Sequence, residues 1–252
     1  MSFEVPADAY DRFMGVHSRQ LAPQLADLAE LESDGRALDV GCGPGALTTE
    51  LVARLGEGSV AAVDPSETFV AAARERHPGV DVQRATAEAL PFPDRDFDAA
   101  LAQLVVHFMA DPLVGIREMA RVTLPDGVVA ACVWDHAGER SPLTPFWKAA
   151  GHLGLGVLDE SGLPGAREGH LVELFEVVGL RDVEQSEVVA RIEYSAFEDW
   201  WEPFSLGVGP AGAAYAGLSE QQRVDLGERC RDLVGPPPFV LESVAWAARG
   251  VV

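Results

Sequence analysis

A glycine-rich loop is the segment of this sequence with the clearest chemical potential. The residues Asp39-Val-Gly-Cys-Gly-Pro-Gly45 end a short apolar run, Ala37–Val40, and precede apolar residues at helical spacing. Glycines at a strand-to-helix turn let the backbone bend tightly and approach a ligand closely. Amides at the start of the following helix favour an anionic group. Taken literally, Gly41-x-Gly43-x-x-Ala46 also fits the dinucleotide fingerprint, so the loop predicts binding of a nucleotide or nucleoside.

Two acids border this loop. Asp39 stands two residues before the first glycine, where a carboxylate suits a cation better than a pyrophosphate. Asp64 ends the next apolar run, Val60-Ala-Ala-Val-Asp64, and an acid at that place can accept hydrogen bonds from both ribose hydroxyls of a nucleoside. The alternative is that both acids are ordinary turn residues at strand ends. Their shared placement favours a nucleoside site.

Histidines follow the later predicted strands. His107 comes soon after the apolar run 98–104 and is the candidate general base, although it could also be a structural histidine in a turn. Trp134 and His136 follow the run 128–133, where a parallel sheet opens its ligand crevice, so both are candidate substrate residues. The sequence shows no clustered His or Asp ligands, so we expect no metal site.

An aromatic stripe marks the second half of the chain. Phe197, Trp200, Trp201 and Phe204 share one face of a helix that Ser195 is expected to cap. Such a stripe is typical of a core. It can also line a lid over an apolar acceptor, and for that role Trp200, Trp201 and Phe204 are the candidates, together with Phe146 from another helical segment.

The composition restricts the class of partner. The chain has 252 residues, with 40 acidic against 19 basic residues and a formal net charge of −21. A surface this acidic repels phosphate backbones and anionic lipid, so we expect no nucleic-acid and no membrane partner. Three cysteines, few and far apart, predict a reducing cytoplasm and no disulfide framework. The arginine and alanine bias suggests a bacterial source, and no pattern fixes the oligomeric state.

Short apolar runs alternate with helical patterns over residues 37–133. This alternation predicts an α/β fold with a doubly wound, mostly parallel sheet and helices on both faces. Two later runs, 183–194 and 239–248, read as strands separated by helices. They predict an antiparallel C-terminal edge on the same sheet.

The ordered motifs resemble those of class I S-adenosylmethionine-dependent methyltransferases. The resemblance rests on the Asp39–Gly45 loop, Asp64-Pro-Ser, Ala87-Glu-Ala-Leu-Pro-Phe92, Phe97-Asp98 and the Arg121–Gly127 turn, and it covers about residues 10–135. The ubiquinone/menaquinone-type small-molecule group is the nearest in pattern. The resemblance implies a seven-stranded Rossmann-like sheet in a single domain, 1–252. Within it we expect a cofactor cover at 1–36, a cofactor-binding core at 37–135, and helical inserts at 141–180 and 195–235 that form a substrate cap.

The resemblance also implies a set of residues for S-adenosylmethionine. Gly41, Gly43 and Gly45, with Asp39 and Cys42 in the same loop, would lie near the methionine part, and Gln103 would join them. Asp64 and Pro65 would lie beside the ribose, and Ala87 and Glu88 beside the adenine. Tyr10 and Arg19 would reach the cofactor from the cover. One departure is Thr86, where the family often has an aspartate.

The resemblance further implies an activity: methyl transfer from S-adenosylmethionine to a small molecule by in-line displacement. The aromatic candidates suggest an apolar or aromatic metabolite as acceptor. Two alternatives stay open. The chain could bind S-adenosylmethionine for other chemistry, or it could be an NAD-dependent oxidoreductase that uses the literal dinucleotide fingerprint.

Overall fold

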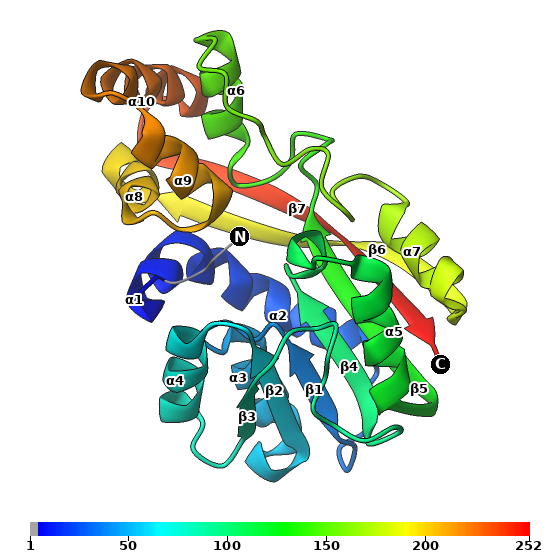
Figure 1. Ribbon diagram of the computed structural model, residues 1–252. Helices are drawn as coiled ribbons and strands as arrows, with labels where there is room; N and C mark the ends of the chain where they lie inside the picture. Colours follow the sequence, from blue (N-terminus) through cyan, green and yellow to red (C-terminus); the bar gives the residue numbers. More distant parts are fainter. Residues whose placement is uncertain (1–4) are drawn as a thin grey trace.

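The fold is built on one seven-stranded sheet. The computed structural model describes residues 5–252, and its strands are ordered β3-β2-β1-β4-β5-β7-β6 (Figure 1). Strands β1 to β5 run parallel, whereas β7 is antiparallel to both β5 and β6. This topology confirms the predicted doubly wound sheet with an antiparallel C-terminal edge. The strands are β1 (Ala37–Val40), β2 (Val60–Asp64), β3 (Asp81–Arg84), β4 (Phe97–Gln103), β5 (Thr123–Trp134), β6 (Arg181–Tyr194) and β7 (Phe239–Val251).

Helices cover both faces of the sheet. Apolar residues of α2, α3 and α4 pack on one face, and those of α5 and α7 pack on the other. Every residue of β1 and β2 is buried, which explains why these strands read as continuous apolar runs in the sequence. The helices are α1 (Ala7–Tyr10), α2 (Val16–Leu28), α3 (Ala46–Leu55), α4 (Glu67–Arg76), α5 (Pro112–Val122), α6 (Thr144–His152), α7 (His170–Val178), α8 (Phe197–Trp201), α9 (Gly209–Gly217) and α10 (Glu220–Val234).

The N-terminal segment lies between the sheet and a group of later helices. Helix α1 contacts α4, and the π-helix η1 (Asp11–Gly15) that follows it contacts η4 (Glu202–Leu206). Helices α6, α8, α9 and α10 gather beyond the ends of β6 and β7 (Figure 1), and α6 packs against α10. These helices, with η4, are called the cap here. The predicted cover begins at residue 1, and its first four residues lie outside the described part of the chain.

Side-chain hydrogen bonds fix the starts of helices α8 and α10. Helix α10 begins with a capping box, in which Ser219 Oγ accepts the Gln222 amide at 3.3 Å and Gln222 Oε1 accepts the Ser219 amide at 2.9 Å. The expected cap at Ser195 is wrong by one residue. Helix α8 follows Ala196, whose amide donates to Asp199 Oδ2 at 3.0 Å. The acid that reaches back therefore fixes this helix start, since an alanine side chain cannot accept a hydrogen bond.

Within residues 5–252, none of the helices has both the length and the apolar character needed to cross a membrane.

Candidate functional site

A cavity of about 320 Å³ opens where the parallel strands end. The loops after β1, β2 and β4 form one side of it, and the N-terminal segment, the loop after β5 and the start of α9 form the other. Such a crevice at the carboxyl ends of parallel strands is the usual ligand site of this class of sheet. Its lining comprises Tyr10, Phe13, Met14, Gly41, Gly43, Asp64, Pro65, Phe69, Thr86, Ala87, Glu88, Gln103, Leu104, Val105, His107, Phe108, Met109, Ala110, Trp134, His136, Leu143, Glu160, Val208, Gly209, Pro210 and Ala211.

The glycines of the loop serve two different purposes. Gly41 has a φ of +73°, and a Cβ there would lie 2.5 Å from Val105 Cγ2, so this glycine is required by packing. Gly43 has a φ of +54°, and the nearest atom to its Cβ position is Tyr10 Cε1 at 3.9 Å. The open space beside Gly43 belongs to the cavity, so its missing side chain leaves room for a ligand.

The amides of the loop are already engaged within the protein. The amides of Gly41 and Cys42 donate to the Val63 carbonyl at 2.8 and 2.9 Å, and the Gly45 amide donates to the Cys42 carbonyl. Gly43 donates to Asp64 Oδ2 at 2.9 Å. The expectation that this loop offers free amides to an anion is therefore not met at these four positions. A loop of this kind lets a ligand approach the backbone, but it is a poor cradle for pyrophosphate.

The two predicted acids lie at different depths. Asp64 lines the cavity, and its other oxygen, Oδ1, accepts the Ser66 amide at 2.8 Å. Burial raises the pKa of Asp64, and its two amide donors oppose that shift. Asp39 lies behind the loop, outside the cavity lining, and accepts a hydrogen bond from Thr48 Oγ1 at 2.6 Å. Burial, with the nearby Asp64 carboxylate, raises the pKa of Asp39 to about 7.

We expect Asp39→Asn to stabilise the ligand-free protein at pH 8 by roughly 4 kcal/mol and to leave it little changed near pH 4. The pKa of Asp39 is about 7 in the folded protein, whereas its ordinary value is 3.8. Wild-type stability therefore falls as pH rises from about 4 to 7, and asparagine removes that loss. Urea unfolding of both proteins at pH 4, 6 and 8 measures the difference. An equal difference at all three pH values would contradict the prediction.

Residues of the N-terminal segment meet the cavity unevenly. Tyr10 lines it and packs edge-on against Phe69 with ring centroids 5.2 Å apart, and burial raises the pKa of its hydroxyl to about 12. Gln103, at the end of β4, donates to the Ser18 carbonyl at 3.1 Å and so ties α2 to the sheet. Arg19 is exposed and lies outside the lining. The predicted contact of Arg19 with a cofactor is not formed in this arrangement.

The other residues predicted for the cofactor divide in the same way. Pro65, Ala87 and Glu88 line the cavity, and Thr86 lines it beside them. Glu88 Oε1 accepts the Ala110 amide at 2.7 Å, which fixes the loop after β4 against the Ala87 turn. Cys42 and Gly45 shape the glycine loop from outside the lining, and the Cys42 thiol donates to the Gly43 carbonyl at 3.4 Å. The cavity thus gathers most of the predicted set.

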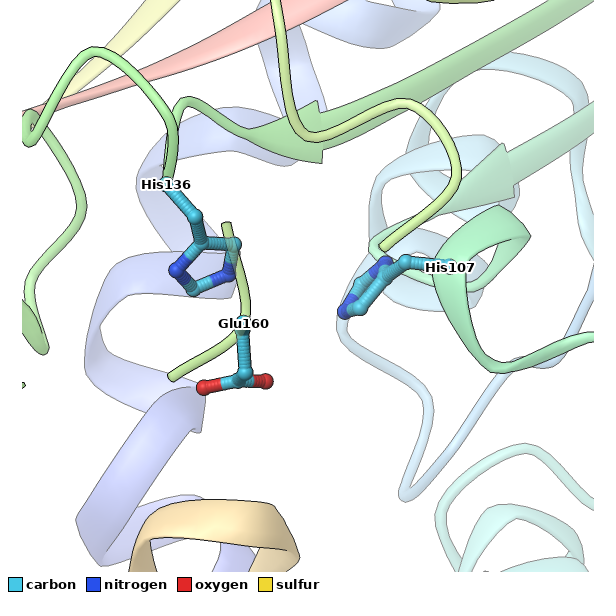
Figure 2. Close-up of side chains that lie close together, drawn as sticks. All are labelled: His107, His136 and Glu160. Atoms are coloured by element: carbon cyan, nitrogen blue, oxygen red, sulfur yellow. The ribbon is translucent and has the colours of Figure 1, made fainter. Parts of the chain in front are cut away.

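The far end of the cavity is apolar with a polar group at its wall. Trp134 and His136 both line it, as the sequence predicts, and so does His107. Strands β4 and β5 are parallel neighbours, with Gln103 opposite Cys132, so their following loops bring the two histidines together. Their ring centroids lie 6.2 Å apart (Figure 2). Glu160, from the segment between α6 and α7, completes this group. The sequence analysis did not single out Glu160, because the residues around it form no pattern that distinguishes it from an acid at the protein surface.

The aromatic stripe packs within the cap. The rings of Phe146 and Phe204 stack with their centroids 4.6 Å apart, and the rings of Phe204 and Trp200 meet edge to face with their centroids 5.0 Å apart. The centroids of the Trp201 and Phe204 rings lie 5.6 Å apart. These four predicted substrate residues are outside the lining of the described cavity. The structure therefore brings them together as a core between α6, α8 and η4, the reading that the stripe also allowed. Phe13 links this core to the cavity, since its ring lies 5.2 Å from Phe204.

Comparison with known proteins agrees with this geometry. Residues 38–131 match the family described as "Methyltransferase domain". A malonyl-[acyl-carrier protein] O-methyltransferase from Halorhodospira halophila is 33% identical over 133 residues, which are 51% of this chain and 45% of that protein. A fatty-acid O-methyltransferase from Mycolicibacterium smegmatis is 28% identical and covers 81% of this chain and 70% of its own length.

The fold also matches solved structures. A geranyl diphosphate C-methyltransferase from Streptomyces coelicolor, in complex with Mg²⁺, geranyl diphosphate and S-adenosyl-L-homocysteine, superposes with a TM-score of 0.54 at 15% identity. The match covers 92% of this chain and 78% of that one. The chain thus has the Rossmann-like fold of methyltransferases. The chain matches less than half the length of the malonyl-[acyl-carrier protein] O-methyltransferase, so the activity of the whole protein is treated as a proposal.

Proposed function

We propose that this chain is a class I S-adenosylmethionine-dependent methyltransferase that acts on a small molecule. The observation that carries the proposal is a single cavity in which Gly43 and Asp64 face one end and an apolar wall with two histidines faces the other. A nucleoside-binding end joined to an acceptor end is what transfer between two bound molecules requires. The family match over residues 38–131 supports the same activity.

The cofactor is assigned to the end formed by the glycine loop. Asp64, at the end of β2, holds the ribose hydroxyls, with Pro65 beside it, and Ala87 and Glu88 flank the adenine. Gly41, Gly43 and Gln103 lie along the methionine part, under Tyr10. Asp39 supports the loop from behind, because its carboxyl is buried and bonded to Thr48. Arg19 would reach the methionine carboxylate only after a rearrangement of α2.

The hydrogen bonds that the backbone amides of the loop already donate argue against the dinucleotide alternative. A pyrophosphate needs several backbone donors at the loop and helix start. Here the amides of Gly41, Cys42, Gly43 and Gly45 are bonded to protein oxygens. The cavity lining within residues 5–252 also lacks lysine and arginine, whereas it carries Asp64, Glu88 and Glu160. Such a charge pattern suits a sulfonium cation better than a diphosphate.

The acceptor is proposed to have an apolar or aromatic body and an ionisable oxygen. Phe13, Met14, Phe108, Trp134 and Leu143 supply the apolar wall. The two relatives reported above are both named as O-methyltransferases. Their acceptors differ from those of the ubiquinone/menaquinone group, so the acceptor class proposed here follows the cavity rather than a subgroup. The net charge of −21 disfavours nucleic acid, and the three buried, unpaired cysteines support a reducing cytoplasm.

The chemistry asks for alignment and, for a hydroxyl acceptor, removal of one proton. The acceptor oxygen attacks the methyl carbon while the carbon–sulfur bond breaks and its electron pair stays on sulfur. Holding the two molecules in line can supply on the order of 7–11 kcal/mol. His107 is the proposed base. Burial, with the neighbouring His136, holds the pKa of His107 well below 6.5, so its imidazole is neutral at pH 7 and can accept a proton.

Calorimetric titration with S-adenosylhomocysteine, with NADH in parallel, tests the cofactor assignment. Binding of S-adenosylhomocysteine without NADH binding is the expected result, and the reverse would overturn the proposal. Incubation with S-adenosylmethionine and a panel of carboxylic acids, phenols and enols then tests transfer. S-adenosylhomocysteine binding without methylated product from any acceptor would favour the alternative in which the fold binds the cofactor for other chemistry.

We expect Asp64→Ala to weaken S-adenosylhomocysteine binding roughly 10- to 100-fold, because hydrogen bonds to a charged group contribute about 1.5–3 kcal/mol. Asp81→Ala is the matched control, since Asp81 is an exposed acid on the adjacent strand β3. Thermal unfolding of both ligand-free variants shows whether loss of the Gly43 and Ser66 bonds has damaged the loop. Unchanged affinity in a folded Asp64→Ala protein would contradict the ribose assignment.

A further inference from the structure

Three ligand-type side chains converge at the acceptor end of the cavity. His107 lies in the turn η3 (Val106–Phe108), His136 follows β5, and Glu160 comes from the segment between α6 and α7. One ligand atom from each lies within 4.8 Å of those of the other two, and all three residues are buried. Figure 2 shows the two imidazole rings facing each other from separate loops, with the Glu160 carboxylate beneath His136.

Polar atoms of this group are left without partners inside the protein. His136 is 7% exposed, and neither of its ring nitrogens has a hydrogen-bond partner among the described residues. His107 is 6% exposed, and its Nδ1 is unpartnered in the same part of the chain. A buried polar atom that lacks a hydrogen-bond partner destabilises the folded protein. These nitrogens therefore indicate that a ligand belongs between the rings.

The carboxylate is held in place for such a ligand. Glu160 is 3% exposed, and its Oε2 accepts a hydrogen bond from Trp147 Nε1 at 3.3 Å. The cavity lining within residues 5–252 has no lysine or arginine to balance Glu160, Asp64 and Glu88. A cation at the cluster would satisfy the imidazole nitrogens and balance the carboxylate at once.

We propose that His107, His136 and Glu160 form a binding site for a divalent transition-metal ion. Two imidazoles and one carboxylate are the donor set of catalytic zinc sites and of non-haem iron sites. Mg²⁺ and Ca²⁺ prefer all-oxygen sites, so Zn²⁺, Fe²⁺ or Co²⁺ is the expected class of ion. Ligand atoms that share an ion at about 2.0–2.2 Å lie about 3–3.5 Å from one another. The three side chains lie within 4.8 Å of one another, so they would have to approach by up to about 1–2 Å when the ion binds.

This site deepens the proposed function and rests on it for its role. Three protein ligands leave open positions that face the cavity, where an acceptor carboxylate or hydroxyl can bind the ion. The ion would lower the pKa of a hydroxyl, whose proton passes to water, and the same oxygen would then take the methyl group. In this arrangement the His107 lone pair would bind the ion, so His107 would not act as the base. The ion would instead make the acceptor hydroxyl acidic enough to lose its proton to water. The acceptor class is thereby narrowed to molecules with a metal-coordinating oxygen.

Metal binding is tested on the full chain, independently of activity. Metal-free protein is titrated with Zn²⁺ by calorimetry and with Co²⁺ by visible absorption. We expect one ion per chain, with Co²⁺ bands typical of nitrogen and oxygen ligands. His136→Ala and His107→Ala should weaken the affinity on the order of 100-fold, and Glu160→Gln, which keeps the shape and the Trp147 bond, at least about tenfold. His152→Ala is the matched control, because His152 is exposed and bonded to Arg229; its affinity should be unchanged.

The outcomes separate this proposal from the proposed function. Sub-stoichiometric binding, or binding that the three cluster variants leave unchanged, overturns the metal site. S-adenosylhomocysteine binding measured on the same samples reports the cofactor end. Intact S-adenosylhomocysteine binding without metal binding overturns only the present inference, whereas metal binding without S-adenosylhomocysteine binding overturns only the cofactor assignment. If a histidine variant fails to fold, the metal affinity of Glu160→Gln decides whether the site exists, because glutamine has the same shape as glutamate.

Discussion

Replacement of Gly43 by valine is expected to abolish measurable binding of S-adenosylhomocysteine. The Cβ position of Gly43 points into the open space of the cavity, 3.9 Å from the nearest atom, Tyr10 Cε1. Two methyl groups added there would occupy the path along which the methionine part is proposed to lie against the backbone. The loss of affinity should exceed that in Asp64→Ala. A bulky side chain at position 43 excludes the ligand, whereas removal of the Asp64 carboxylate only removes hydrogen bonds to it.

Backbone strain must be separated from this steric block. Gly43 has a φ of +54°, and a β-branched residue in that region costs roughly 1–2 kcal/mol per residue. Gly179→Val is the matched control. Gly179 follows α7 in the left-handed region with a φ of +96°, nothing lies within 4 Å of its Cβ position, and it is outside the cavity lining. Calorimetry and thermal unfolding of both variants should show similar losses of stability but a loss of binding only in Gly43→Val. Full binding by a folded Gly43→Val protein would refute the close approach of ligand to the loop.

Removal of the His107 side chain is expected to lower turnover about 10²- to 10⁴-fold while the affinity for S-adenosylhomocysteine stays within about threefold of wild type. The ring lies with His136 at the end of the cavity proposed for the acceptor, and other residues line the end proposed for the cofactor. A base acts on the acceptor proton in the transition state, so its loss affects the chemical step. Single-turnover kinetics with a methyl acceptor, and calorimetry on the same samples, measure the two quantities.

The result also separates the two roles of His107. As a base, the imidazole accepts the acceptor's proton, and a chelator leaves wild-type turnover unchanged. As a metal ligand, the same side chain holds an ion, so chelation lowers wild-type turnover to the level of His107→Ala. His152→Ala serves as the control in both series, since His152 is exposed and does not line the cavity that contains His107. Wild-type turnover in His107→Ala would remove both roles.

The residues proposed for the cofactor gather in one cavity, and the sequence could predict this grouping because they follow local patterns. Asp64 ends an apolar run and Gly43 lies between a strand and a helix, and parallel strands side by side place such residues at one edge of the sheet. The antiparallel edge formed by β6 and β7 followed from the same strand periodicity. The exact start of α8 did not, because Asp199 rather than Ser195 supplies the side-chain bond that begins it.

The tertiary structure alone decided which residues complete the group around His107 and His136. Glu160 reaches His107 and His136 through a long connection, and a distance across such a connection leaves no periodic trace in the sequence. Arg19 has the charge to bind a carboxylate, yet the turn of α2 directs it to solvent. Trp201 and its neighbours could have lined a lid or a core, and the packing of Phe146 in α6 against Trp201 and Phe204 made them a core. Local spacing thus determined which residues gather beside the glycine loop, whereas contacts between distant segments placed Glu160 beside the two histidines and buried the aromatic stripe.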